Sequence, residues 1–164
     1  MIYGHGFDGV EMAEPDEDVR GRLLSREADD SDGWRKCLLV ALAGPLTDAI
    51  YCGKTGSEIA KLTSLDLKLD HGAGGDWHNA ENAAAHLLNV ARARDSETRS
   101  LLELLLKKAK LHVLADLHRP VVWRAIEEVA KRLLSTGRLT EEEVFEITRD
   151  VPRLPLPEFD LREA

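Results

Sequence analysis

The chain has 164 residues, 43% of them hydrophobic, and 30 acidic against 22 basic side chains give it a net charge of -8. This length suits one domain with its own core, and the excess of negative charge disfavours binding to nucleic acid or to an anionic membrane surface. The longest nearly unbroken apolar run, Cys37–Ala43, is far shorter than the ~20 residues that span a bilayer, and the two cysteines make no disulfide framework, so we expect a cytoplasmic protein without a membrane segment.

Residues 1–32 are predicted to be an irregular N-terminal segment. Gly4, Gly6 and Gly9 precede a cluster of acidic residues, and this composition favours turns and contact with solvent. The segment has room for a short strand, either at Met1–Tyr3 or at Gly9–Met12.

Residues 33–151 are predicted to form a helical domain, because apolar residues recur there at helical spacing. The first helix follows a residue that can cap it, Ser31 or Asp32. Pro45 lies inside this helix, where a proline removes one backbone hydrogen bond and costs ~3 kcal/mol. We therefore expect a kink at Pro45 or two abutting helices.

Turn signals divide the rest of this domain. Thr55–Leu69 is ambiguous, with a short helix at Ser57–Leu62 as one interpretation. A Gly-rich turn then ends at Asp76, which can cap a helix that continues to about Arg92. A long helix follows and ends at about Leu117.

Two further helices are marked by their ends. Pro120 opens one and Gly137 ends it, and Thr140–Glu143 forms a capping box that starts the other. Prolines prevent residues 152–164 from continuing the last helix. The sequence therefore predicts an all-α fold of about six helices in a single bundle-like domain, with an irregular N-terminal segment and a Pro-rich C-terminal tail.

Three segments of the chain follow one another in a distinctive order. Val40–Gly53 is a predicted helix that contains Ala-Gly-Pro, Gly72–Trp77 is a Gly-rich turn with an aspartate at a helix start, and Ile126–Ile147 is a helix pair whose second member is capped. Together they resemble the peptidase domain of FtsH-type ATP-dependent zinc metalloproteases, over roughly residues 7 to 150. In its AGxxAEExxFG helix that family has a glutamate where this chain has Asp48.

The resemblance gives one residue a metal-binding role. In the family the aspartate of the Gly-rich turn is the third zinc ligand, so its counterpart here would be Asp76. The other two ligands belong to H-E-x-x-H on an upstream helix, where two histidines one turn apart reach a single Zn²⁺ and the glutamate activates its water. None of the six histidines here forms an i, i+4 pair, and the resemblance implies a chain that begins just after the missing helix, without the family's motor or membrane anchor.

Asp76 alone does not make a catalytic zinc site, because such a site needs about three protein ligands. His71 and His78 are the nearest further donors, but His78 would lie about 200° round a helix from Asp76. We therefore favour a capping role for Asp76, with both histidines partly solvated, over a metal-binding cluster. A basic run that is typical of a solvated helix face lies further along, at Lys107, Lys108 and Lys110.

The sequence thus predicts a peptidase-like helical domain without proteolytic activity, with no catalytic residue and no bound cofactor as it stands. Such a domain would act as a binding or scaffolding module, with a protein partner or by self-association and without nucleic acid. The alternative is a zinc metallopeptidase whose H-E-x-x-H helix is missing from this chain by truncation or is supplied by another chain, with Asp76 as a zinc ligand. A helical DNA-binding regulator, suggested by the final helix pair alone, is a third hypothesis.

Overall fold

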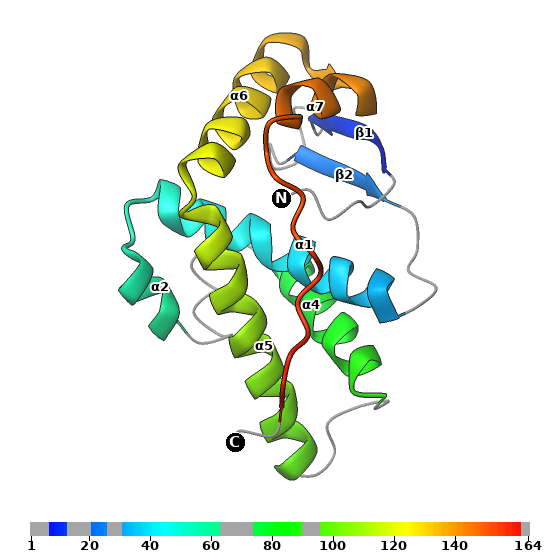
Figure 1. Ribbon diagram of the computed structural model, residues 1–164, viewed down its shortest axis with the longest axis vertical. Helices are drawn as coiled ribbons and strands as arrows, with labels where there is room; N and C mark the ends of the chain where they lie inside the picture. The colour runs from blue at the N-terminus through cyan, green and yellow to red at the C-terminus, as the bar shows by residue number, and fades with distance from the viewer. Residues whose placement is uncertain (1–6, 13–20, 26–30, 63–73, 90–95, 162–164) are drawn as a thin grey trace. The chain divides into compact units, whose positions relative to one another are not determined.

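The computed structural model describes residues 7–12, 21–25, 31–62, 74–89 and 96–161 (Figure 1). Most of these residues lie in six helices, so the predicted all-α fold class is confirmed. Contacts between residues divide the chain into two units. Unit 1 comprises Ala28–Leu117 and Leu156–Ala164 together with Met1, and unit 2 comprises Ile2–Glu27 and His118–Pro155. The predicted boundaries at residues 32 and 151 stay a prediction.

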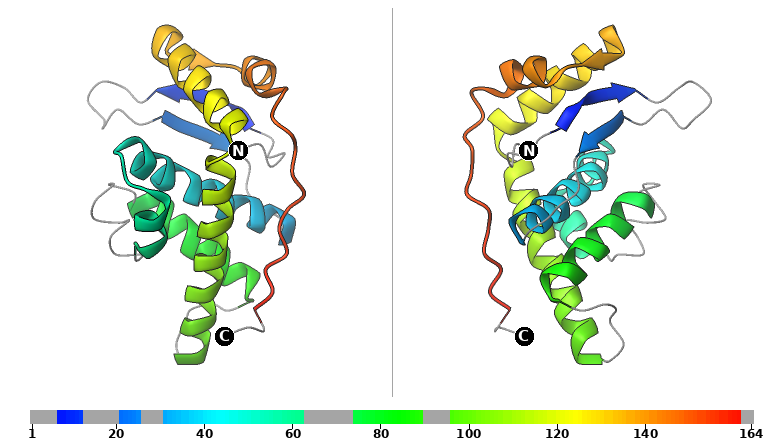
Figure 2. Two further views of the ribbon diagram at one scale, coloured as in Figure 1. Left: turned by 60° about the vertical axis from the view of Figure 1, so that its left-hand side comes forward. Right: turned by 90° about the vertical axis from the view of Figure 1, so that its right-hand side faces the viewer.

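The described part of unit 1 contains four helices: α1 (Ser31–Tyr51), α2 (Gly56–Lys61), α4 (Gly74–Leu87) and α5 (Ser96–Leu117). Helix α1 packs most extensively against α4 and also contacts α5 (Figure 2). The centre of this core consists of fully buried side chains of α1, namely Leu38, Leu39, Leu42, Leu46 and Ala49. Each buried leucine contributes about 1.5–3 kcal/mol of hydrophobic free energy to folding. Helix α4 contributes mainly small side chains, which let it approach α1 closely: Ala80, Ala83 and Ala84.

Pro45 lies inside α1, which is one helix from Ser31 to Tyr51. The predicted alternative of two abutting helices is therefore wrong. Pro45 is fully buried, so apolar burial around it offsets the ~3 kcal/mol that a mid-helix proline costs. Gly53 follows the helix with a φ of 84°, the left-handed conformation in which glycine commonly ends helices.

Helix α2 begins at a capping box that lies inside the ambiguous stretch. The backbone N–H of Thr55 donates to Glu58 Oε2 at 2.7 Å, and the backbone N–H of Glu58 donates to Thr55 Oγ1 at 3.3 Å. The helix therefore starts one residue before the predicted Ser57, and residues 63–69 lie outside the described residues. Helix α4 ends at Leu87, earlier than predicted, and Asn89 follows it with a φ of 53°.

The described part of unit 2 contains two helices, α6 (Pro120–Thr136) and α7 (Glu141–Thr148). It also contains a three-stranded antiparallel sheet in the order β2-β1-β3, made of β1 (Phe7–Met12), β2 (Gly21–Ser25) and β3 (Arg138–Leu139). Val10 pairs with Leu23 on one side and Leu139 on the other, so β1 is the central strand. The predicted strand at Gly9–Met12 lies within β1, whereas β2 and β3 were not predicted and the alternative at Met1–Tyr3 lies outside the described residues.

The predicted ends of the unit 2 helices are confirmed. Pro120 occupies the first turn of α6, and Gly137 ends that helix with a φ of 77°. The capping box between Thr140 and Glu143 starts α7, with the Thr140 N–H donating to Glu143 Oε2 at 2.8 Å. Residues 152–161 continue without helix, as the prolines predict. None of the described helices combines the length and the apolar character that a membrane span requires.

Candidate functional site

Asp76 lies in the first turn of α4, against α1. A Cβ atom added to Gly44 of α1 would lie 3.0 Å from Asp76 Oδ2, so the carboxylate lies close to the α1 backbone at this glycine. Helix α4 starts at Gly74, so Asp76 is its third residue and not the predicted N-cap. A carboxylate in this first turn interacts favourably with the helix dipole. Two of the three segments that carry the family resemblance therefore meet in unit 1.

The neighbouring Trp77 anchors this turn. Its side chain is only 3% exposed, and its indole N–H donates to Glu81 Oε1 at 2.8 Å one turn further along α4. A buried indole of this size holds a helix end in a defined position. Asp76 is therefore an exposed residue in a helical turn that Trp77 anchors beside α1.

The second predicted donor, His78, is positioned differently. It is exposed, and its Nε2 forms a hydrogen bond of 3.1 Å with Asn82 Nδ2 on the same helix. Because His78 follows Asp76 by two residues on α4, the two side chains leave the helix about 200° apart. The third predicted donor, His71, lies outside the described residues.

These donors do not fit a zinc site. No group of three or more His, Cys, Asp and Glu side chains within the described ranges is placed to hold a metal ion. Asp76 and His78 do not converge, so the described residues offer a single carboxylate where the family places its third ligand. We therefore derive no catalytic step through zinc.

The basic run on α5 is not a solvated face, contrary to prediction. Lys110 is only 7% exposed, and its Nζ donates to the backbone carbonyls of Ala60 at 2.9 Å and Leu62 at 2.7 Å. This amino group thus binds the C-terminal carbonyls of α2 and fastens α2 to α5. Lys108 Nζ donates to the backbone carbonyl of Asp160, and Lys107 is the exposed member of the run.

His112, one turn beyond Lys108, contacts the same C-terminal segment. Its ring meets the Phe159 ring edge-on, with the ring centroids 6.5 Å apart and an interplanar angle of 90°. On its own helix, His112 Nε2 lies 3.8 Å from Asp116 Oδ2, and Asp116 is buried. Residues 156–161 are therefore docked on α5, a contact that the sequence did not predict. The sequence signal for this contact is the alternation of acidic Glu158 and Asp160 with apolar Phe159 and Leu161.

Two other features of unit 1 are structural. The rings of Trp34 on α1 and His86 on α4 stack in parallel with centroids 3.9 Å apart, which adds an aromatic contact to the helix pair. Neither Cys37 nor Cys52 is in a disulfide bond. Partial burial raises the pKa of the Cys37 thiol, which disfavours the thiolate that a cysteine nucleophile needs.

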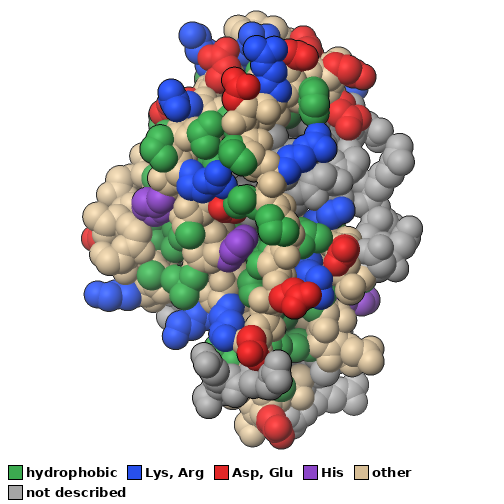
Figure 3. Space-filling view, in the orientation of Figure 1, with side chains coloured by type: hydrophobic (Ala, Val, Ile, Leu, Met, Phe, Trp, Pro, Cys, Tyr) green, Lys and Arg blue, Asp and Glu red, His purple; other side chains and the backbone are tan. Residues whose placement is uncertain are grey.

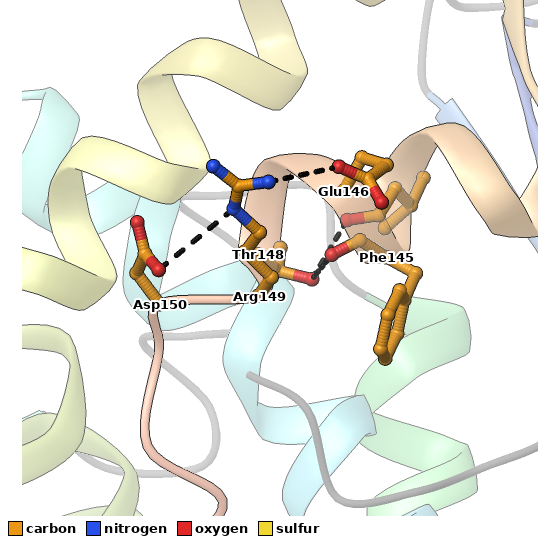
Figure 4. Close-up of polar contacts among 6 residues, drawn as sticks. Phe145, Glu146, Thr148, Arg149 and Asp150 are labelled. Carbon is orange, nitrogen blue, oxygen red and sulfur yellow. Dashed lines mark hydrogen bonds and ion pairs between the residues drawn. The ribbon is translucent and has the colours of Figure 1, made fainter.

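The end of α7 in unit 2 carries a small polar cluster (Figure 4). Arg149 pairs with Glu146 at 3.3 Å and with Asp150 at 3.9 Å, and all three side chains are exposed. Thr148 Oγ1 donates to the Val144 carbonyl at 2.7 Å, which is a local helix contact. Exposed pairs of this kind contribute about 0–1 kcal/mol to stability, so we interpret this cluster as surface ion pairs at the end of α7.

On the face drawn in Figure 3, basic and acidic side chains lie among apolar ones. Comparison of the chain with protein-family models, with curated proteins and with solved structures found no significant match. The Asp76 turn and the α5 surface that holds residues 156–161 are therefore the two candidate functional sites.

Proposed function

We propose that this chain is a helical module of the FtsH-peptidase type that binds protein and, as these 164 residues stand, does not cleave peptide bonds. The observation that carries the proposal is the docking of the extended segment 156–161 on α5, through Lys108 and His112. A surface that holds an extended chain segment offers the contacts that peptide binding uses, namely a donor for a backbone carbonyl and an aromatic neighbour.

The approach of Gly44 to Asp76 supports the family resemblance. The Ala-Gly-Pro segment and the Gly-rich turn are separated in the sequence, yet the structure brings an Asp76 carboxylate oxygen within 3.0 Å of the Cβ position at Gly44. A glycine is favoured at position 44 because a larger residue would compete with that carboxylate for space.

The count of zinc donors supports binding over hydrolysis. H-E-x-x-H does not occur in the 164 residues, and His78, the donor nearest to Asp76 in the described chain, bonds to Asn82 instead. A catalytic zinc takes about three protein ligands and keeps one position for water. One carboxylate neither retains such an ion nor tunes its water.

A second candidate function is a zinc metallopeptidase that is completed by an H-E-x-x-H helix from another segment or another chain. The exposure of Asp76 beside α1 favours it, because histidines of another segment can reach a carboxylate that is exposed to solvent. In that arrangement Asp76 would be a zinc ligand, and the glutamate of the incoming helix would act as the base.

Metal analysis and a proteolysis assay distinguish these two functions. The untagged chain is equilibrated with zinc, dialysed and assayed both for bound metal and for cleavage of a quenched fluorescent casein. The proposal predicts less than one equivalent of zinc, no difference between wild type and Asp76→Ala, and no cleavage. Stoichiometric zinc that is lost in Asp76→Ala, or casein cleavage that a chelator abolishes, would refute it.

Self-association is the simplest form of binding, because a second copy carries the same tail and the same α5 surface. Sedimentation velocity over a wide range of protein concentration measures it directly. A weight-average mass that rises with concentration supports association between copies, whereas a constant monomer mass limits the partner to a different protein.

A further inference from the structure

The C-terminal segment turns one side toward α5. Pro157, Phe159 and Leu161 are half-buried, whereas Glu158 and Asp160 between them are exposed. Alternation of this kind is typical of an extended chain that lies on a surface, because successive side chains point to opposite sides. The segment therefore turns Phe159 toward α5 and leaves Glu158 and Asp160 exposed to solvent.

Two neighbouring residues of α5 make the contacts that fix the direction of the segment. Lys108 donates to the Asp160 carbonyl and His112 meets the Phe159 ring, so the residue number rises along the segment as it falls along α5. Lys108 and His112 are four residues apart and therefore lie on one face of the helix. The segment runs antiparallel to α5 along that face, as Figure 1 shows.

These contacts select a kind of peptide and not one particular sequence. A backbone carbonyl accepts the Lys108 hydrogen bond, and every residue of a peptide offers such a carbonyl. The His112 ring contacts the Phe159 ring, so the surface favours an aromatic side chain at that position of the peptide. Glu158 and Asp160, on either side of Phe159, are exposed. The contacts therefore specify an extended segment with an aromatic side chain.

We infer that the α5 face formed by Lys108 and His112 is a binding surface for an extended peptide with an aromatic side chain, and that residues 156–161 occupy this surface in cis. This inference rests on the proposed function, since it names the surface and the partner chemistry of a protein-binding module. A tethered segment acts at an effective concentration of about 1 mM, so a segment whose own dissociation constant is about 0.1 mM weakens the binding of a free peptide roughly tenfold.

Fluorescence anisotropy with the full-length chain tests the inference. The probe is a labelled synthetic peptide with the sequence of residues 154–164, and the receptor is either wild type or Phe159→Ala, whose own tail lacks the aromatic contact. The Phe159→Ala chain is expected to bind the probe roughly tenfold more tightly than wild type, because it removes the internal competitor. A probe that itself carries the Phe159→Ala change should not bind.

Three further variants locate the effect. Tyr51→Ala, which removes an aromatic side chain that is 85% exposed on α1, is the matched control and should bind the probe as wild type does. Adding Lys108→Met to Phe159→Ala should weaken binding of the probe. Leu156→Ala releases the other end of the segment, and it replaces Phe159→Ala if circular dichroism shows that the latter is unfolded.

The inference is overturned if the released chains bind the probe no better than wild type, or if none of the chains binds it. Those outcomes refute peptide binding at the Lys108–His112 surface. They do not affect the zinc and casein measurements, which distinguish protein binding from hydrolysis. Conversely, a chain that holds zinc through Asp76 or cleaves casein refutes the proposed function whatever the peptide does.

Discussion

Gly44→Ala tests the approach of Asp76 to α1 with a single methyl group. In a helix interior, alanine is more stable than glycine by about 0.8–1.0 kcal/mol, so the change alone should stabilise α1. The new Cβ atom would lie 3.0 Å from Asp76 Oδ2, closer than carbon and oxygen atoms normally approach. Asp76 is exposed and can rotate away, at a cost of order 0.5–1.5 kcal/mol for an unfavourable rotamer.

These two terms nearly cancel, so we expect Gly44→Ala to change the free energy of unfolding of wild type by less than about 0.5 kcal/mol. In an Asp76→Ala background the carboxylate is gone, and the same change should stabilise the chain by about 1 kcal/mol. The double-mutant cycle therefore predicts a coupling of about 0.5–1.5 kcal/mol between positions 44 and 76.

Urea denaturation followed by circular dichroism measures the four free energies of unfolding in this cycle. Gly53→Ala is the control, because a Cβ atom at Gly53 has no neighbour within 4 Å; its φ of 84° makes the change destabilising, but its effect should be the same in both backgrounds. If Gly44→Ala changes stability equally with and without the Asp76 carboxylate, the close approach of the two segments is incorrect.

Two further predictions concern the contacts of α2. Lys110→Ala should destabilise the chain by about 1.5–3 kcal/mol in urea denaturation, since it leaves the Ala60 and Leu62 carbonyls without their charged donor, whereas exposed Lys107→Ala should stay within about 0.5 kcal/mol of wild type. Equal effects of the two changes would contradict the burial of Lys110. Hydrogen bonds from the Thr55 hydroxyl and then the Thr55 N–H lower the pKa of Glu58, so the carboxylate supports the start of α2 at neutral pH. This support is complete above the ordinary glutamate pKa of about 4.3 and is lost as pH falls through the lowered value, so NMR shifts of α2 should show fraying in acid that Glu58→Gln abolishes.

Local signals in the sequence predicted the ends of several helices. The ends of α6 and α7 depend only on a few adjacent residues, because each signal acts on the backbone next to it. These signals are Pro120, Gly137 and the Thr140–Glu143 box. The same pattern at Thr55–Glu58 is equally local, yet the prediction started that helix at Ser57. Burial of Pro45 against other parts of unit 1 is not local, and this is why its effect on α1 was misjudged.

Long-range contacts explain the rest of what the sequence did not predict. Strand β3 has two residues, and it exists because Arg138 and Leu139 pair with β1 near the other end of the chain. The basic run on α5 has the composition of a solvated face, but its lysines meet carbonyls that only the folded chain brings near them. The resemblance singled out Asp76, and its zinc role stays a prediction.

The two bound lysines of α5 point away from each other, because residues two apart on a helix are rotated by about 200°. Lys110 fastens α2, and Lys108 fastens the C-terminal segment. Acylation of either amino group would remove its charge and its donors, and would loosen one of these attachments while leaving the other intact. Helix α5 thus holds α2 and the C-terminal segment through two separate amino groups, and loss of one contact leaves the other in place.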